Sequence, residues 1–376
     1  MRRIKILIII GALDIGGAEG QVYELAKGLD KQRFELVICS LVNHGVYIPK
    51  IRQLGIRVET ITERMRYVPL NLHRLIQLIK QEKFDIVHNV LFTSELFGTF
   101  AAKYGKVPVI INSIRSMGFL RYKNRRPIKK MLYNVSDITI ANSNLLKNTL
   151  IAYNLANEHK IKVIYNGVDT DKFSQRSIST SLADGNRSFN IPSRDIRVVG
   201  AVASLTPVKN HICLLHAIPS ILEEVPKTIF LIIGNGALKP MLEKESRDLQ
   251  IRKNIFFTGN RDDTANLLAA MDLSVLCSVR EGFANVILES MACGTPVIAS
   301  NVGGNGEAVQ HGVSGFLFES NAHLELADRV KKLLREEVLR QQMGIAARQR
   351  VTEYFSLQKM LTQYHGLYDS LMALKS

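Results

Sequence analysis

Short apolar runs alternate along the whole chain with longer amphipathic stretches. Most of these runs are rich in Ile and Val and apolar on both faces, which is typical of strands in a parallel sheet covered by helices. In the first half of the chain we expect strands at residues 4–10, 35–41, 57–61, 85–90, 107–112, 137–141 and 161–165. Helical patterns lie between them, for example at residues 20–29 and 71–80.

The same alternation starts again in the second half. We expect strands at residues 196–203, 228–233, 254–258, 273–277, 297–299 and 315–318. Helical patterns occur at residues 237–249, 262–271, 286–292, 324–335 and 357–374. Strands that alternate with helices in this way predict an α/β protein with two doubly wound domains. The turn-rich segment 166–169 is the expected linker between them.

Composition excludes several classes of protein. Hydrophobic residues make up 46% of the 376 residues and charged residues 22%, the balance of a folded globular chain. No apolar run approaches the roughly 18 residues of a membrane-spanning helix. The four cysteines form no CxxC pair, so we expect neither a disulfide framework nor a structural zinc site. The start of the chain resembles a signal peptide, but Lys5 interrupts its apolar run, and we interpret it as a first strand in a cytoplasmic protein.

The net charge of +15 is unevenly distributed. Residues 1–172 contain 27 Lys or Arg and 14 Asp or Glu, whereas residues 173–376 contain 22 and 20. Within residues 115–130 there are seven cations and no acid, namely Arg115, Arg121, Lys123, Arg125, Arg126, Lys129 and Lys130. Apolar and aromatic residues lie among them. This combination is typical of a surface that binds an anionic membrane or nucleic acid. The alternative is a basic face that is exposed to solvent and binds no partner.

The segment 280–289, Arg-Glu-Gly-Phe-Ala-Asn-Val-Ile-Leu-Glu, is the strongest candidate for chemistry. Glu281 follows a strand, at the sheet edge where α/β proteins bind ligands. Glu289 falls on the next helix, and free amides near its start, at Asn285 and Val286, can hold a phosphate. Carboxylates beside a phosphate site are best matched to neutral hydroxyl groups, so sugar rings are the natural ligands.

Other candidates also lie where strands end. Gly16 and Gly17 separate the first strand from its helix and let backbone amides approach an anion. Lys209 follows the strand 196–203 and could neutralise a diphosphate. His88 lies near the end of one strand of the first half, and Arg115 follows another. The sequence Asp169-Thr170-Asp171 spells a metal-binding DxD, but it lies in the linker, so we expect a solvated turn and no required metal.

Together these motifs resemble the family 4 retaining glycosyltransferases (glycosyl transferases group 1), which have the GT-B fold. The resemblance covers essentially the whole chain. It rests on these segments in order: Gly16-Gly17-Ala18-Glu19, Asn166-Gly167-Val168-Asp169, Pro207-Val208-Lys209-Asn210, Glu281 with Glu289, Gly294-Thr295-Pro296-Val297, and Val302-Gly303-Gly304 with Glu307.

The resemblance implies two facing Rossmann-like domains with an interdomain cleft. Residues 1–167 would bind the acceptor, residues 168–355 the nucleotide-sugar, and the helix 356–376 would cross back to the first domain. Donor contacts are implied for Gly16, Gly17, Ser204, Lys209, Asn260, Arg261, Glu281, Gly282, Phe283, Ala284, Asn285, Val286 and Glu289. Among these, Lys209 would hold the diphosphate, Glu289 the ribose and Glu281 the transferred sugar. A sugar-side role is implied for His88.

Two positions depart from the family pattern. The family usually has an arginine five residues before the lysine, where this chain has Ser204. Positive charge from Arg261 or Arg280 would then support the diphosphate. The family often has a second histidine two residues after His88, where this chain has Val90.

We therefore expect a retaining glycosyltransferase that needs no cofactor. Its donor would be a nucleotide-sugar, with a UDP-sugar favoured, and it would transfer a hexose or N-acetylhexosamine. The acceptor would be a lipid-linked or other saccharide, in the synthesis of lipopolysaccharide, capsule or another surface polysaccharide, at the inner face of the cell membrane. The alternatives are a GT-B-like epimerase or phosphorylase and, from another class, a basic nucleic-acid-binding protein. Against the last, the chain lacks recognised nucleic-acid modules and regularly spaced stacking aromatics.

Overall fold

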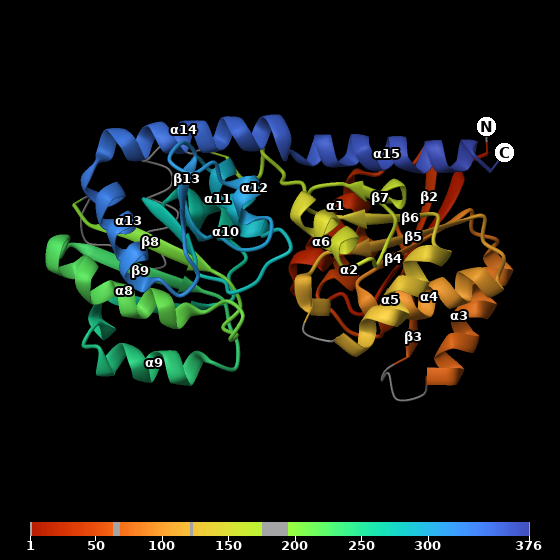
Figure 1. Cartoon of the computed structure of the whole chain (residues 1–376), viewed down its shortest axis with the longest axis horizontal. Helices are drawn as coiled ribbons and strands as arrows, with labels where there is room; N and C mark the ends of the chain where they lie inside the picture. Colours follow the sequence, from red (N-terminus) through yellow and green to blue (C-terminus); the bar gives the residue numbers. More distant parts are fainter. Residues whose placement is uncertain (1, 63–67, 121–122, 175–194, 376) are drawn as a thin grey trace. The chain divides into compact units, whose positions relative to one another are not determined.

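The computed structural model describes residues 2–62, 68–120, 123–174 and 195–375 (Figure 1). The chain forms two compact units, each with its own parallel sheet. Unit 1 consists of Met1–Gly167 and Leu357–Ser376, and unit 2 of Val168–Ser356. The chain therefore passes from one unit to the other twice, at Gly167–Val168 and at Ser356–Leu357.

Unit 1 is built on a seven-stranded sheet in the order β3-β2-β1-β4-β5-β6-β7. Its strands are β1 (Ile4–Ile10), β2 (Phe34–Val42), β3 (Arg57–Thr62), β4 (Ile86–Val90), β5 (Val109–Ile114), β6 (Ile138–Ala141) and β7 (Ile161–Val163). Its α-helices are α1 (Gly17–Gly28), α2 (Tyr47–Gln53), α3 (Val68–Glu82), α4 (Phe92–Tyr104), α5 (Arg126–Val135), α6 (Asn144–Ala152) and α15 (Leu357–Ala373). Short 3₁₀ turns lie at η1 (Met117–Leu120), η2 (Lys123–Arg125) and η3 (Glu158–Lys160).

The two faces of β1 explain how this sheet is covered. Side chains alternate across a strand. Ile6, Ile8 and Ile10 therefore pack against α1 and α15, whereas Leu7 and Ile9 pack against α3 and α4 on the other face. All five side chains are fully buried. Helix α15 comes last in the sequence, yet it completes the core of the first unit.

Unit 2 repeats the same plan with six strands in the order β10-β9-β8-β11-β12-β13. Its strands are β8 (Arg197–Val202), β9 (Thr228–Ile233), β10 (Ile255–Gly259), β11 (Leu273–Leu276), β12 (Val297–Ser300) and β13 (Gly315–Phe318). Its helices are α8 (His211–Glu224), α9 (Lys239–Asp248), α10 (Thr264–Ala269), α11 (Asn285–Ala292), α12 (Asn305–Ala308), α13 (His323–Arg335) and α14 (Glu337–Tyr354), with a 3₁₀ turn at η4 (Arg252–Asn254).

Every strand expected from the sequence is present, with ends that shift by at most two residues. All the strand pairs in both sheets are parallel. The prediction of an α/β protein with two doubly wound sheets is therefore confirmed. Helix α14 was not predicted. Its buried side carries Arg340 as well as Met343, Ala347 and Val351, and Val338 and Ile345 on the same helix are exposed, so its apolar and polar positions are poorly separated in the sequence.

Candidate functional site

The central pair of unit 2 is Lys209 and Glu281. Lys209 lies between β8 and α8, and Glu281 lies between β11 and α11. Because β8 and β11 are neighbours in a parallel sheet, both loops lie at its carboxyl edge. Lys209 Nζ donates to Glu281 Oε1 over 2.6 Å, and Ser278 Oγ donates to the same oxygen over 2.6 Å. The sequence-predicted cation and carboxylate are therefore in direct contact.

A glycine turn holds the Glu281 loop from behind. The Gly304 amide donates to the Gly282 carbonyl over 2.8 Å. Gly303 has φ +57°, and a Cβ at this position would lie 2.2 Å from the Glu281 carbonyl oxygen. Only glycine permits both the backbone conformation and this close approach. Glu281 is thus fixed by its backbone as well as by its side chain.

The loop leads directly into α11. Phe283 and Ala284 are buried, and no side chain caps the helix start at Ala284. The first-turn amides, which include those of Asn285 and Val286, have no carbonyl partner inside the helix. Glu289 follows one turn later and is half-buried. A helix start, a cation and a carboxylate therefore lie at one stretch of the sheet edge, and Glu289 follows on the helix; its part in a ligand site stays a prediction.

The other candidate donor residues in unit 2 lie on neighbouring loops. Ser204 is exposed just after β8, and Asn260 is exposed just after β10. Arg261 is already engaged, because its Nε and Nη2 donate to Asp263 over 2.8 and 2.7 Å. Arg280 is half-buried and has no ion pair within the described part of the chain. Of the two arginines, Arg261 therefore binds a carboxylate, whereas Arg280 binds none among the described residues.

His88 lies in the centre of unit 1 and is completely buried. Its Nδ1 lies 2.9 Å from the Tyr368 hydroxyl, and its Nε2 lies 2.7 Å from the Ser113 hydroxyl. Burial, and secondarily the charge of Arg115, lowers the pKa of His88 to about 3. The ring is therefore neutral at physiological pH. Both nitrogens are engaged, which favours a structural over a sugar-contacting position.

This burial predicts a measurable pH effect. The folded pKa of His88 is about 3 and its ordinary value is 6.5, so the unfolded chain binds the proton more readily. Stability from this group is complete above pH 6.5 and is lost as the pH falls towards 3. At pH 5 the loss amounts to about 2 kcal/mol. In urea titrations we expect His88→Gln to lose about 2 kcal/mol less than wild type between pH 7.5 and 5. Exposed His159→Gln is the control, and equal losses in all three proteins would contradict the assignment.

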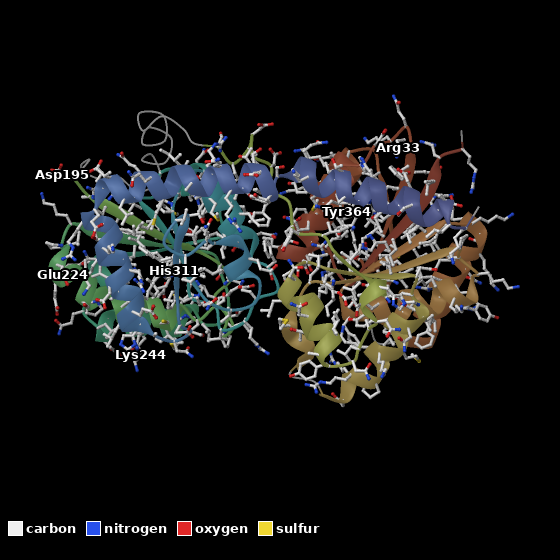
Figure 2. All side chains as sticks on the ribbon, turned by 45° about the horizontal axis from the view of Figure 1, so that its top comes forward. Arg33, Asp195, Glu224, Lys244, His311 and Tyr364 are labelled. Carbon is white, nitrogen blue, oxygen red and sulfur yellow. The ribbon has the colours of Figure 1, made fainter. Side chains whose placement is uncertain are left out.

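Arg115 follows β5 and is held by two partners. Its Nη1 donates to Asn166 Oδ1 over 2.8 Å, and its Nη2 donates to the hydroxyl of Tyr364 over 2.9 Å. Tyr364 projects from α15 (Figure 2). Within the described residues, Arg115 Nε is buried without a hydrogen-bond partner. The guanidinium is thus positioned by the linker and the last helix, at the carboxyl edge of the sheet.

The Gly16–Gly17 loop precedes α1 at this same edge. A Cβ at Gly16 would lie 2.1 Å from the Glu19 carboxylate, so the side chain of Glu19 folds back over this residue. Desolvation by burial is the main cause that raises the pKa of Glu19, and Arg115 opposes it. Gly17 is exposed at the start of the helix. Two small residues therefore lie at the start of α1, and their contact with a donor stays a prediction.

The basic stretch is not uniformly exposed. Lys129 was expected to face a membrane or acceptor, but it is only 3% exposed. Its Nζ donates to Glu95 over 2.8 Å and to the Tyr133 hydroxyl over 2.7 Å. Lys129 therefore belongs to the interior of unit 1, between α4 and α5, and the expectation was wrong because a buried acid distant in sequence neutralises it.

The remaining cations of this stretch differ in their surroundings. Arg125 lies 4.9 Å from the ring centre of Phe92, and Arg126 lies 4.3 Å from that of Tyr153. Lys130 is exposed on α5. Arg121 and the side chain of Lys123 lie outside the described residues. Three described cations, Arg125, Arg126 and Lys130, thus remain candidates for a basic surface.

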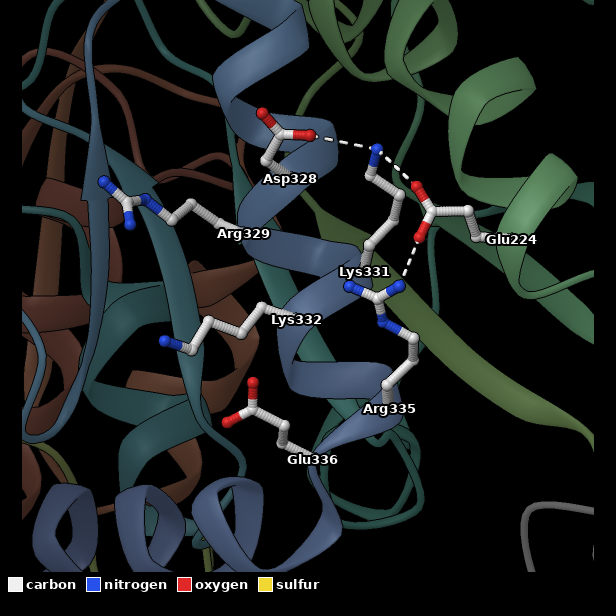
Figure 3. Close-up of a pocket in the computed structure, with 7 residues that line it drawn as sticks. All are labelled: Glu224, Asp328, Arg329, Lys331, Lys332, Arg335 and Glu336. Carbon is white, nitrogen blue, oxygen red and sulfur yellow. Dashed lines mark hydrogen bonds and ion pairs between the residues drawn. The ribbon is translucent and has the colours of Figure 1, made fainter.

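A separate charged pocket of about 320 Å³ lies between the end of α8 and α13 (Figure 3). Lys331 Nζ binds Glu224 and Asp328, each over 2.9 Å, and Arg335 also binds Glu224. Glu224 ends α8, whereas Lys209 precedes that helix of 14 residues. At 1.5 Å per residue the two ends are about 20 Å apart. This pocket is therefore distinct from the Lys209–Glu281 pair.

The Asp169-Thr170-Asp171 segment forms a local turn. Asp169 Oδ1 accepts from the backbone amides of Asp171 and Lys172 over 3.2 and 3.0 Å. Among the described residues, no group of three His, Cys, Asp or Glu side chains could hold a metal ion. Nor does any helix of the described chain have the length and apolar character to cross a membrane.

Three residues that bind candidate site residues were not predicted from the sequence. Ser278, which binds Glu281, lies only three residues before it and could have been noticed as a polar residue at a strand end. Tyr364 and Tyr368 lie on the buried, largely apolar side of α15. Their hydroxyls bind Arg115 and His88 across 249 and 280 residues of sequence, and no local signal reveals that pairing.

Comparison with known proteins agrees with this architecture. The family model "Glycosyltransferase Family 4" matches residues 15–172, and "Glycosyl transferases group 1" matches residues 186–350. The UDP-Gal:alpha-D-GlcNAc-diphosphoundecaprenol alpha-1,3-galactosyltransferase of Escherichia coli is 29% identical, over 81% of this chain and 80% of its own. The capsular polysaccharide glycosyltransferase CapM of Staphylococcus aureus is 28% identical, over 80% of this chain and 81% of its own.

A solved structure shows the same fold. The crystal structure of HepE from Anabaena, in complex with UDP and glucose, matches with a TM-score of 0.88 and 22% identity. The match covers 98% of this chain and all of that one. The family models and the relatives agree with the two parallel-sheet units of the structure. The chain belongs to the family 4 glycosyltransferases and has the GT-B fold.

Proposed function

We propose that this glycosyltransferase moves a hexose or N-acetylhexosamine from a UDP-sugar to a lipid-linked or other saccharide acceptor, with retention of the anomeric configuration. The observation that carries the proposal is the contact between Lys209 and Glu281 at the carboxyl edge of the unit 2 sheet. Support for the substrates comes from relatives that use UDP-Gal or contribute to capsule synthesis. Unit 2 would hold the donor and unit 1 the acceptor.

The pair suits the departure of a diphosphate. Without donor, Glu281 neutralises the ammonium of Lys209. A bound diphosphate would compete for that ammonium, because it carries more negative charge than one carboxylate. Glu281 would then accept hydrogen bonds from hydroxyl groups of the sugar. The amides at the start of α11 would hold the phosphates, and Glu289 the ribose. Lys209 would stabilise the charge that develops on the leaving group.

A ligand screen tests the donor assignment. Thermal shift of the purified chain would be measured with UDP, GDP, ADP and the corresponding sugars. A ligand at 100 times its Kd stabilises the native state by about 2.7 kcal/mol. We expect UDP and a UDP-sugar to raise the Tm, and turnover with the preferred donor to survive EDTA. A shift with GDP or ADP alone would reassign the base, and loss of activity that Mn²⁺ restores would contradict the metal-free site.

The dependence of UDP release on an acceptor distinguishes a transferase from an epimerase-like enzyme. A transferase should release UDP much faster when a saccharide acceptor is present, and the new linkage should keep the anomeric configuration of the donor. Acceptor-independent release of UDP and free sugar would instead indicate an epimerase-like activity. Analysis of the product by NMR distinguishes retention from inversion directly.

The basic surface of unit 1 would bring the enzyme to its acceptor. Helix α5 exposes Ile128, Met131 and Val135 as well as Lys130. Apolar and basic residues on one helix favour an anionic leaflet, where each Lys or Arg near the surface is worth about 1 kcal/mol. We therefore propose peripheral attachment to the cytoplasmic face of the membrane, with no role for nucleic acid.

Vesicle sedimentation tests this attachment. Changing Arg125, Arg126 and Lys130 together to Ser should weaken binding to anionic vesicles about 100-fold at physiological salt, because three cations are lost. Lys129 stays unchanged, since it is part of the core. The matched control replaces three exposed lysines of unit 2, Lys227, Lys244 and Lys253. Equal effects of both triple variants would show that net charge alone, and not this surface, is responsible.

A further inference from the structure

Gln21 makes an unusual pair of hydrogen bonds to the point where the chain leaves unit 1. This residue lies on α1 and is 4% exposed. Its Nε2 donates to the Gly167 carbonyl over 2.9 Å, and its Oε1 accepts from the Gly167 amide over 3.0 Å. One side chain therefore satisfies both polar groups of a buried backbone residue that is 146 positions away.

Gly167 is closely packed against the start of α15. A Cβ at this position would lie 2.9 Å from Leu357 Cα and 2.9 Å from Met360 Cβ, where the chain returns to unit 1. The next residue, Val168, already belongs to unit 2, and its amide donates to the Phe355 carbonyl over 3.0 Å. Gly167 is thus packed between α1 and α15, immediately before the crossing.

A second contact fixes the preceding residue. Asn166 is 4% exposed and accepts a hydrogen bond from Arg115, which Tyr364 also binds. The crossover Asn166–Gly167 is therefore attached to three elements of unit 1: α1, the end of β5 and α15. Like Tyr364, Gln21 is a member of this group of contacts that no motif of the sequence indicates.

We propose that Gln21 is a positioning residue for glycosyl transfer. It lies four residues after Gly17, on the helix that begins at the Gly16–Gly17 loop. By binding both polar groups of Gly167, it makes that loop and the crossover move as one body. The inference rests on the proposed function and on the donor contact that the family resemblance implies for Gly16 and Gly17. It adds a residue that acts through the backbone without touching the substrate.

Gln21 suits this task for a chemical reason. A primary amide carries a donor and an acceptor side by side, so it can pair with a peptide group as another peptide would. A methionine of similar length would fill the space but leave both groups of Gly167 buried and unpaired, which is costly. A glutamate would keep an acceptor for the Gly167 amide but would face its carbonyl with a negative charge.

Hydrogen exchange tests the physical tie without any substrate. In Gln21→Met we expect exchange of the Gly167 amide to become at least about tenfold faster, because a buried amide loses its acceptor. The matched control is Thr99→Val, which also removes two buried side-chain hydrogen bonds from unit 1, to Asn89 and Asn112. It should leave Gly167 unchanged. Unchanged exchange in the Gln21 variant would overturn the tie.

Kinetics test the functional consequence. With the donor found by the thermal-shift screen, Gln21→Met should lower kcat about 5- to 20-fold while the KM for the donor changes less than about twofold, because the donor groups of unit 2 are intact. Thr99→Val should keep kcat within about twofold. Should Gln21→Met fail to fold, Gln21→Glu serves as the second variant, since it keeps one hydrogen bond.

The two arms separate the possible failures. Faster exchange at Gly167 with unchanged kcat would overturn the positioning role and leave Gln21 a structural residue. If no nucleotide-sugar supports turnover in the wild type, the proposed function fails, yet the exchange experiment still decides whether Gln21 ties α1 to the crossover.

Discussion

Lys209→Ala and Glu281→Gln should each lower the turnover of sugar transfer by about 100-fold or more, because each removes a charged group that, in the proposed complex, acts on the leaving diphosphate or the transferred sugar. The Lys209→Ala change would remove the positive charge that, in the proposed complex, stabilises the departing diphosphate. Glu281 would lose the carboxylate that binds Lys209, Ser278 and, in the proposed complex, the sugar. Initial rates of UDP release measure the effect. Near-normal rates in both variants would refute the assignment.

A second ion pair in unit 2 provides the matched control. Lys331 and Glu224 lie in the charged pocket at the far end of α8. Lys331→Ala and Glu224→Gln remove groups of the same kind but should leave turnover within about twofold of wild type, because the pocket is remote from the donor loops. The Tm of all four variants shows that lost activity is not lost folding. If the control pair impaired transfer equally, a general electrostatic effect would explain the result.

Lys129→Met should destabilise unit 1 by about 3–5 kcal/mol, because it strands a buried carboxylate. Glu95 has no exposed surface, and the ammonium of Lys129 is its charged partner at 2.8 Å. The Tyr133 hydroxyl also binds Lys129, and burial, followed by the charge of Glu95, raises the pKa of this phenol well above its usual range. Urea denaturation measures the free energy of unfolding.

The neighbouring Lys130 supplies the control for this change. It is exposed on the same helix, so Lys130→Met should alter stability by about 0.5 kcal/mol or less. The double variant Lys129→Met with Glu95→Leu should recover most of the loss, because no unpaired charge remains. A small effect of Lys129→Met alone would contradict the view that Lys129 is needed to neutralise the buried Glu95.

Local sequence was sufficient for the two sheets. Strands such as β1 and β9 are continuous apolar runs bounded by turn residues, and their alternation with helices predicts the parallel topology. The same signals placed Lys209 and Glu281 at strand ends. Because neighbouring parallel strands end at one edge, residues 72 positions apart could be expected to meet there.

Long-range burial could not be predicted in this way. Lys129 lies among seven cations of similar appearance, and only the folded chain shows that Glu95 neutralises it. His88 looked like a candidate at a strand end, but Tyr368, near the other end of the chain, seals it inside. The pairing of Gln21 with Gly167 likewise depends on how α1 meets the linker. Such contacts depend on tertiary packing, which hydrophobic periodicity and turn residues do not predict.

The placement of α15 has a consequence for protein synthesis. A ribosome delivers the strands of unit 1 first, then every residue of unit 2, and only then the helix that carries Tyr364 and Tyr368. Until that helix emerges, Ile6, Ile8 and Ile10 lack part of their cover, and His88 and Arg115 lack their tyrosine partners. The inserted unit therefore has its full set of residues before the unit that began first. We therefore expect unit 1 to complete its packing only after all of unit 2 has been synthesised.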